Sequence, residues 1–154
     1  MRIRLQGAEA QDAFGQRIAG VLSAPCVVYL QGNLGTGKTT LVRGVLRGLG
    51  HVGSVRSPTY TLLEPYELGR MTLYHLDLYR LGDPEELEFL GLRDLLNDES
   101  VLLVEWPERG EGVLPPPDLR IQIDYADEAR VLELVAARRR GEELITGLSR
   151  QGRG

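Results

Sequence analysis

The chain has 154 residues, enough for one domain with a sizeable hydrophobic core, and we expect the whole span 1–154 to form it. Its mild net charge of −4 and ordinary composition argue against a broad surface for nucleic acid or membrane lipid. A single cysteine excludes an internal disulfide, and no long apolar run or basic leader is present, so we expect a soluble, cytoplasmic protein without membrane contact.

The N-terminal third has the pattern strand, helix, strand, helix. Met1–Leu5 alternates charged and apolar residues, which is typical of an edge strand with one solvated face. Apolar residues recur at helical spacing in Ala8–Leu22, and a proline follows this helix. Cys26–Leu30 is a short apolar run that predicts a buried strand, and Thr39–Leu49 again has the apolar stripe of a helix.

The middle of the chain predicts a hairpin, two short helices and a buried strand. Thr59–Tyr66 and Met71–Tyr79 are strand-like runs joined by a turn that contains glycine, which is the pattern of an antiparallel hairpin. A helix is expected from about Pro84, because an aspartate precedes this proline and glutamates follow it. A second short helix is expected near Leu92–Leu96. The continuous apolar run Val101–Val104 is typical of a strand buried on both faces.

The C-terminal third predicts a loop, a second hairpin and a helix. The glycine- and proline-rich segment Gly110–Pro117 is expected to be a mobile surface loop. Leu119–Tyr125 alternates, with its apolar residues and the tyrosine on one side, and Ala129–Ala137 can return as the hairpin partner. Glu142–Leu148 predicts a modest helix, and residues 149–154 are expected to form a loose polar tail.

One stretch of the chain indicates a specific binding chemistry. Gly32–Thr39 matches the phosphate-binding pattern G-x-x-x-x-G-K-[ST] in full. In this pattern backbone N–H groups surround a phosphate, the lysine reaches the β- and γ-phosphates, and the hydroxyl of Thr39 is placed to ligate Mg²⁺. The predicted strand before the loop and helix after it stand in the order that the motif requires. The residues expected to bind the nucleotide are Asn33, Leu34, Gly35, Thr36, Gly37, Lys38, Thr39 and Thr40.

The use of lysine supports this interpretation over a chance glycine-rich turn. Lys38 is the only lysine in the chain, whereas arginine occurs many times. A compact ammonium on a flexible stem suits a phosphate loop better than a planar guanidinium does. We therefore expect an α/β fold, a single-domain P-loop NTPase whose mixed central sheet is parallel around the loop, carries antiparallel edge hairpins and is flanked by helices.

Three further side chains could complete a site for a γ-phosphate and Mg²⁺. Thr59 lies in a loop before a strand, as a phosphate-sensing switch would, although the Ser-Pro-Thr sequence also suits a simple turn. Asp77 closes a strand among apolar and aromatic residues, a position that suits either metal chemistry or a turn cap. Glu105 ends a buried strand, where ligands bind in open α/β sheets, and it is the strongest candidate for an acidic metal or water ligand.

The phosphate loop is one of several ordered motifs, and the full set is Gly32–Thr40, Ser57–Leu62, His75–Arg80, Asp83–Leu87 and Val104–Glu108. Together these motifs resemble the TsaE (YjeE) family, bacterial P-loop ATPases needed to form threonylcarbamoyladenosine in tRNA. The resemblance extends from Val28 to about Val131. The family's loop often has Asp and Ala where this chain has Asn33 and Thr36, but both positions contribute mainly backbone N–H groups.

The resemblance implies roles for individual residues, with ATP as the nucleotide and Mg²⁺ as the metal. Thr39, Glu105 and Asp77 would lie at the metal, and the two acids would also be needed for hydrolysis. Thr59 would be a switch-like hydroxyl that takes part in turnover. Trp106 would lie close to the nucleotide.

The resemblance also implies partners. TsaE proteins work with TsaB and TsaD, and TsaD transfers threonylcarbamoyl to the adenosine next to the anticodon. The role of TsaE resembles activation or resetting of that transferase, driven by ATP. The tRNA would then be contacted only indirectly, through the complex.

Two other classes of function use a similar loop. A small-molecule kinase also needs an acceptor site and an arginine-rich lid, but Arg80, Arg93 and Arg109 are scattered singly and no lid is apparent. A binding switch like the small GTPases would need an Asn-Lys-x-Asp element for guanine, which a chain with one lysine cannot supply. The residues therefore favour an ATPase, with the kinase and the switch as alternatives.

Overall fold

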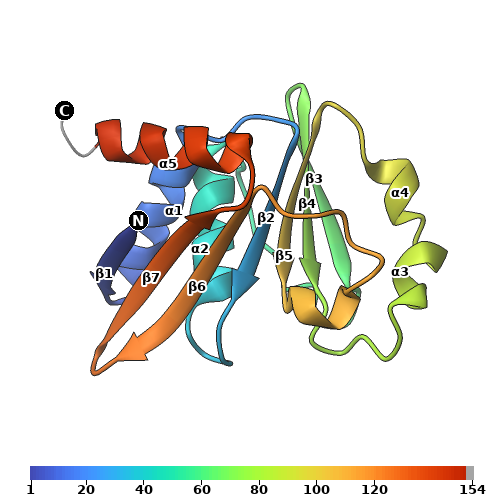
Figure 1. The fold of residues 1–154 in the computed structure, drawn as a ribbon, viewed down its shortest axis with the longest axis horizontal. Helices are drawn as coiled ribbons and strands as arrows, with labels where there is room; N and C mark the ends of the chain where they lie inside the picture. Colours follow the sequence, from blue (N-terminus) through green and yellow to red (C-terminus); the bar gives the residue numbers. More distant parts are fainter. Residues whose placement is uncertain (152–154) are drawn as a thin grey trace.

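The computed structural model, which describes residues 1–151, contains seven strands, five α-helices and one 3₁₀ helix in that part of the chain (Figure 1). The elements are β1 (Arg2–Gln6), α1 (Ala8–Ala19), β2 (Cys26–Gln31), α2 (Lys38–Gly48), β3 (Leu63–Leu68), β4 (Met71–Asp77), α3 (Glu85–Phe89), α4 (Leu92–Leu95), β5 (Ser100–Glu105), η1 (Pro107–Gly110), β6 (Leu119–Ala126), β7 (Ala129–Ala136) and α5 (Arg139–Gln151). The strands form one sheet in the order β1-β7-β6-β2-β5-β4-β3. β6, β2, β5 and β4 are parallel neighbours, whereas β1, β7 and β3 pair antiparallel. The predicted α/β fold with a parallel centre and antiparallel edges is confirmed.

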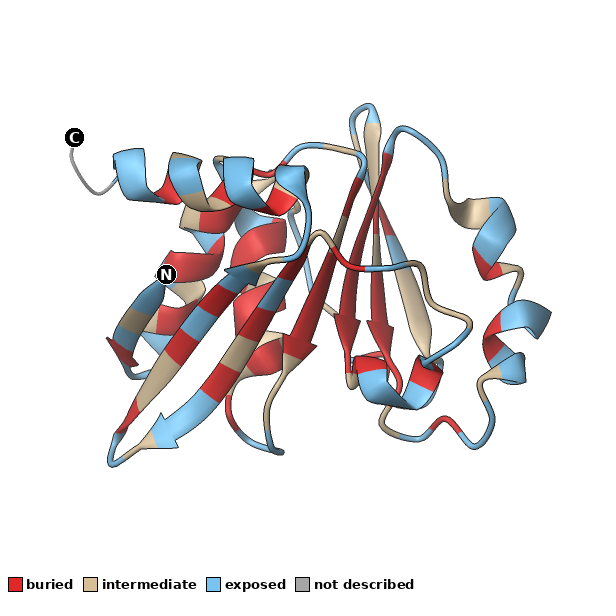
Figure 2. Cartoon of the chain, viewed as in Figure 1, coloured by how far each residue is buried: buried red, intermediate tan, exposed pale blue. Residues whose placement is uncertain are grey.

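The two faces of the sheet carry separate hydrophobic clusters, because side chains alternate along each strand. In β2, Val28 and Leu30 belong to a cluster with α1, α2 and α5, whereas Tyr29 belongs to the opposite cluster with α3 and α4. β5 lies in the middle of the sheet and is buried at every position (Figure 2). The predicted strand with two buried faces is confirmed, and Glu105 at its end is fixed between β2 and β4.

α1 and α2 lie close together on one face of the sheet. Two glycines permit this approach: a Cβ at Gly15 would collide with the carbonyl oxygen of Leu41, and one at Gly44 would collide with the carbonyl oxygen of Asp12. The helix that follows the phosphate loop is therefore fixed against α1, so that α1 can also contact the loop itself.

The first strand of the central hairpin begins later than the sequence predicts. It starts at Leu63 rather than Thr59, because residues 58–62 form a turn. The N–H of Leu62 donates to the carbonyl of Pro58 at 2.8 Å, and Leu62 has a left-handed φ of 67°. Thr59 consequently lies in a turn beside the sheet instead of within a strand.

Two helix ends also differ from the prediction. α1 stops at Ala19 rather than Leu22, because a glycine follows and the backbone there turns back on the last helical residues. α5 extends to Gln151, whose side-chain amide donates to a carbonyl near the end of α1 at 3.1 Å. Residues 149–151 of the expected loose tail are therefore helical, and residues 152–154 lie outside the described part of the chain.

The loop Gly110–Pro117 forms neither helix nor strand beyond the glycine that ends η1, as the sequence predicts. It is attached to the sheet at two points. The hydroxyl of Tyr29 donates to the carbonyl of Pro115, and Leu114 packs on the cluster beneath α3 and α4. Its mobility stays a prediction.

Two features bear on the environment of the chain. Cys26 is buried in β2, and burial raises the pKa of its thiol to about 12, so that it serves as an apolar packing group. Within residues 1–151, no helix combines the length and the apolar character needed to cross a lipid bilayer.

Candidate nucleotide-binding site

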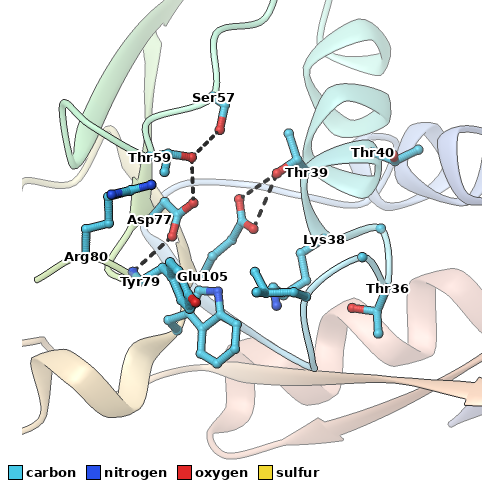
Figure 3. Close-up of a pocket in the computed structure, with 14 residues that line it drawn as sticks. Thr36, Lys38, Thr39, Thr40, Ser57, Thr59, Asp77, Tyr79, Arg80 and Glu105 are labelled. Carbon is cyan, nitrogen blue, oxygen red and sulfur yellow. Dashed lines mark hydrogen bonds between the residues drawn. The ribbon is translucent and has the colours of Figure 1, made fainter.

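A cleft of about 480 Å³ lies where the ends of β2, β4 and β5 meet the N-terminus of α2 (Figure 3). The carboxyl ends of parallel strands are where ligands bind in open α/β sheets. Three parts of the chain line the cleft: residues 34–40, the hydroxyl residues Ser57 and Thr59, and the strand-end residues Asp77, Tyr79, Arg80, Glu105 and Trp106.

The phosphate loop is braced from both sides by side chains of other elements. From α1, the buried Gln11 donates its amide to the carbonyl of Thr36 at 2.8 Å. From β6, the hydroxyl of Tyr125 donates to the carbonyl of Leu34, also at 2.8 Å. Gly37 has a φ of 98° and lies so close to Gln11 that a Cβ there would collide with its amide. These contacts define the shape of the loop backbone.

Lys38 is buried at the base of the cleft. Its ammonium donates to the carbonyl oxygens of Gly32 and Asn33, the latter at 3.3 Å, and lies 4.1 Å from the ring centroid of Trp106. Burial lowers the pKa of this ammonium, while the nearby carboxylate of Glu105 acts in the opposite direction. Loop carbonyls and an aromatic face thus hold the cation, and phosphate oxygens can replace these weak partners.

Glu105 connects the loop helix to the strand ends. Its two carboxylate oxygens lie 3.2 and 3.4 Å from the hydroxyl of Thr39. The register of the parallel pair puts Asp77 of β4 beside Glu105. His75 lies two residues earlier in β4 and so faces the same side, with its Nε2 2.6 Å from a carboxylate oxygen of Glu105.

Asp77 is the second buried acid of the cleft. It accepts a hydrogen bond from the backbone N–H of Tyr79 at 3.1 Å and a long one from the hydroxyl of Thr59 at 3.5 Å. Burial raises the pKa of Asp77, and the neighbouring charge of Glu105 raises it further. Two carboxylates face one ammonium in this confined space, so the cleft favours a bound cation.

Arginine side chains pack on aromatic rings at the side of the cleft that carries Tyr79, Arg80 and Trp106. The rings of Tyr79 and Trp106 lie 5.0 Å apart, and the guanidinium of Arg109 lies 5.3 Å from the Tyr79 ring. The guanidinium of Arg80 lies 4.5 Å from the ring of Tyr60 in the turn 58–62. Sequence spacing gave no reason to link Arg80 to the phosphate loop, but the structure makes it part of the lining.

The structure brings most of the expected residues to one place. Loop residues 34–40 and the four other candidates Thr59, Asp77, Glu105 and Trp106 all line the cleft. Asn33 does not line it and is exposed; its carbonyl instead accepts hydrogen bonds from Lys38 and Thr36 within the loop.

Sequence reasoning did not assign a role to four residues that the site uses. His75 could have been found, because a residue two positions before Asp77 in a strand must face the same side. Gln11 and Tyr125 gave no signal, since their contacts with the loop depend on tertiary packing across 25 and 91 residues. Tyr125 was predicted on the same side of its strand as Ile121 and Ile123; those two are buried, but 51% of Tyr125 is exposed. Tyr79 was assigned only to a strand end.

Comparison with known proteins agrees with the sequence motifs and the fold. The family model described as "Threonylcarbamoyl adenosine biosynthesis protein TsaE" matches residues 5–132. A TsaE protein of Haemophilus influenzae is 50% identical over 141 residues, covering 88% of this chain and 89% of its own. A TsaE protein of Bacillus subtilis is 38% identical over 151 residues, covering 97% and 94%.

A solved structure gives the same result for the fold. The crystal structure of YdiB from Bacillus subtilis superimposes with a TM-score of 0.84 at 33% identity and covers 99% of this chain and 95% of its own. The match of the family model exceeds half of the chain, and the relatives are similar over nearly their full length. The chain therefore belongs to the TsaE family of threonylcarbamoyladenosine biosynthesis proteins.

Proposed function

We propose that this chain is a Mg²⁺-dependent ATPase that acts with TsaB and TsaD in the threonylcarbamoyladenosine modification of tRNA. One observation carries the enzymatic part of the proposal. The carboxylate of Glu105 lies beside the hydroxyl of Thr39, at the N-terminus of the helix that follows a complete phosphate loop. An acid in this position is suited to interact with a metal ion bound to the β- and γ-phosphates.

The residues of the cleft fit a magnesium ion. Magnesium prefers oxygen ligands and keeps several waters, so it is bound by one or two protein oxygens together with substrate phosphates. Thr39 and Glu105 offer such oxygens, and Asp77 lies beside them in register. When bound, the ion would neutralise negative charge that develops on the phosphates.

The chain's own groups divide the remaining work. Backbone N–H groups of the loop and the ammonium of Lys38 would bind the phosphates in the ground state. Asp77 has a raised pKa and lines the cleft, so it could orient an attacking water and accept its proton. Water adds to the γ-phosphorus, the bond to the bridging oxygen breaks, and ADP and inorganic phosphate leave.

Two observations support a part for TsaB and TsaD: family membership, and the exposed turn 58–62 beside the cleft. The turn 58–62 holds Thr59 at a long distance from Asp77 and exposes 80% of Tyr60. A partner that covers this turn could move Thr59 and Arg80 toward the γ-phosphate. ATP turnover would then be coupled to activation or resetting of the transferase, with tRNA contacted only through the complex.

Measuring ADP and inorganic phosphate together tests the proposal. An ATPase releases the two products in equal amounts without any acceptor, and the rate falls to background when a chelator removes Mg²⁺. A kinase would release ADP only with an acceptor and would transfer the label of [γ-³²P]ATP to it. Failure to bind ATP·Mg²⁺ by calorimetry would contradict the enzymatic assignment altogether.

A further inference from the structure

His75 is a fully buried histidine with one hydrogen bond, and that bond goes to the central acid of the cleft. Its Nε2 lies 2.6 Å from Oε2 of Glu105. Its other ring nitrogen, Nδ1, is one of two buried side-chain polar atoms in the described part of the chain that have no hydrogen-bond partner.

The surroundings fix the direction of this hydrogen bond. A carboxylate can only accept, so the proton of the bond belongs to Nε2 of His75. No acceptor is available to Nδ1, so a proton there would be a buried donor without a partner. The geometry therefore assigns a hydrogen to Nε2, directed at Glu105, and leaves Nδ1 without a partner.

A purely structural role explains His75 poorly. A buried polar atom without a partner weakens folding, and an apolar side chain of similar size would avoid that cost. The histidine nevertheless occupies a central position in β4, next to Leu103 of β5 in the sheet register. What it contributes is the bond to Glu105.

Glu105 needs such a restraint, because a competing partner lies in the same cleft. Burial lowers the pKa of the Lys38 ammonium and the charge of Glu105 raises it, so the two groups lie close enough to interact, yet the ion pair of Glu105 in the structure is with His75 and not with Lys38. A direct pair would occupy both the lysine that binds phosphate and the acid that faces the metal position. The bond from His75 holds one oxygen of Glu105 on the side of β4 and leaves the carboxylate beside Thr39.

We propose that His75 is a positioning residue that holds Glu105 in the orientation needed for Mg²⁺-dependent turnover and prevents it from pairing with Lys38. This inference rests on the proposed ATPase function. It assigns to His75 the role that a hydrogen-bond donor behind a metal-linked carboxylate plays in other metal sites, where its loss costs about 10- to 100-fold in activity or metal affinity.

A pair of substitutions separates positioning from packing. His75→Leu removes the donor and keeps an apolar side chain in the buried position, whereas His75→Gln retains an amide N–H with a reach similar to that of Nε2. We expect kcat to fall about 10- to 100-fold in His75→Leu, with the Mg²⁺ requirement shifted to higher concentration. KM for ATP should change little, and His75→Gln should recover a large part of kcat.

Nuclear magnetic resonance provides a test that does not depend on turnover. The chain has only two histidines, His51 and His75, so selective ¹⁵N labelling gives two imidazole patterns. We expect His75 to show a protonated Nε2 and a bare Nδ1, and to shift when ADP and Mg²⁺ are added, with a much smaller shift at His51. In His75→Leu, calorimetry should show that Mg²⁺ strengthens ADP binding less than in the unmodified chain.

The results distinguish this inference from the proposed function. If the unmodified chain hydrolyses ATP, and His75→Leu does so at the same kcat and Mg²⁺ requirement, positioning by His75 is wrong. Equal loss in the Leu and Gln variants would indicate a packing role and would also overturn it. An Nδ1–H tautomer of His75 would contradict it even if His75→Leu did not fold. If the unmodified chain neither binds nor hydrolyses ATP, it is the proposed function that fails.

Discussion

The cleft has two walls, and they are built differently. The phosphate loop, residues 34–40, forms the phosphate-loop wall, and Thr59 of the turn 58–62 forms the opposite wall together with Arg80. On the phosphate-loop wall, the carbonyls of Thr36 and Leu34 accept bonds of 2.8 Å from Gln11 and Tyr125, which belong to distant elements. On the opposite wall, the turn 58–62 reaches the site through a bond of 3.5 Å from Thr59 to Asp77. The contact of Arg80 with Tyr60 on this wall is also long, at 3.4 Å.

This difference suggests a division of labour between the walls. A loop whose N–H donors are already oriented binds phosphate with little free-energy cost of reorganisation, and this favours ground-state affinity. A turn with few buried contacts lies at the low-stability end of a structure and can be rearranged by a ligand or a partner. Between the walls, the acids at the strand ends are buried and, in the proposed function, would supply the chemistry. Variants in these three places should therefore affect different steps.

The largest effect is expected at the strand-end acids. Asp77→Asn and Glu105→Gln keep the size of the side chain but remove a proton acceptor or a charged metal ligand. We expect turnover to fall about 10²- to 10⁴-fold while nucleotide affinity changes only a few-fold, since these groups act mainly in the transition state. Asp127→Asn, at the exposed turn between β6 and β7, is the matched control. Full ATPase activity in either acid variant would contradict the assignment.

Lys38→Ala tests the phosphate-loop wall directly. The ammonium would make two charge-assisted hydrogen bonds to phosphate, each worth about 1.5–3 kcal/mol, so affinity for ATP should fall about 10²-fold or more. Calorimetry with ATP and Mg²⁺ measures this loss. Arg47→Ala, an exposed position on the same helix, should leave affinity nearly unchanged. Retained affinity in Lys38→Ala would mean that the loop backbone alone supplies the binding energy.

Thr59→Ala tests the turn 58–62 and should have a smaller effect. Loss of one hydrogen bond is worth about 0.5–1.5 kcal/mol, which corresponds to roughly 2- to 10-fold in rate. We expect this loss mainly in the turnover measured with TsaB and TsaD present, because the bond to Asp77 is long in the chain alone. Thr61→Ala, in the same turn but bonded to Glu64, is the control. Equal losses with and without the partners would show that the turn is already in its working position.

Dependence on the partners is tested by comparing the ATPase rate of the purified chain with the rate after TsaB and TsaD are added. Other phosphate-loop enzymes gain about 10³- to 10⁵-fold when a partner supplies or orders a catalytic group. If the purified chain alone matched the rate of the three-protein mixture, the idea of a partner-ordered wall would be wrong. A self-sufficient ATPase, or a kinase with an unidentified acceptor, would then be the better interpretation.

The phosphate-loop wall and the strand ends were largely predictable from the sequence. Local patterns suffice there, because a phosphate loop has a fixed spacing and a strand of alternating or continuous apolar residues fixes which side chain ends at the sheet edge. Glu105 and Asp77 were found in this way. The braces from Gln11 and Tyr125 were not, since nothing local distinguishes a polar residue that contacts a distant backbone carbonyl from one that faces water.

The turn 58–62 and Arg80 were predicted less well for a related physical reason. Thr59–Leu62 has strand propensity, yet Leu62 takes a left-handed conformation and closes a turn instead. Tertiary packing decided this, because the hydroxyl of Thr59 reaches Asp77 only if the chain turns there. Arg80 illustrates the same limit: its position in the lining depends on how the chain leaves β4 and not on its spacing from the loop.

The smallest expected effect is optical, at Trp106. It is the only tryptophan, it lies with its ring 4.1 Å from the ammonium of Lys38, and it follows Glu105 directly, so any change in tryptophan emission reports this cleft. When phosphate draws the ammonium away from the ring, the charge next to the indole changes, and the emission intensity or maximum should change with it. We expect a saturable change with ATP·Mg²⁺ and a smaller one with GTP at equal concentration, whereas Lys38→Ala should remove the response. An unchanged spectrum at saturating ATP, with binding verified by calorimetry, would show that Lys38 keeps its place over the ring. The phosphates would then be held by the loop backbone. In that case the phosphate-loop wall would change even less on nucleotide binding than its contacts with Gln11 and Tyr125 suggest.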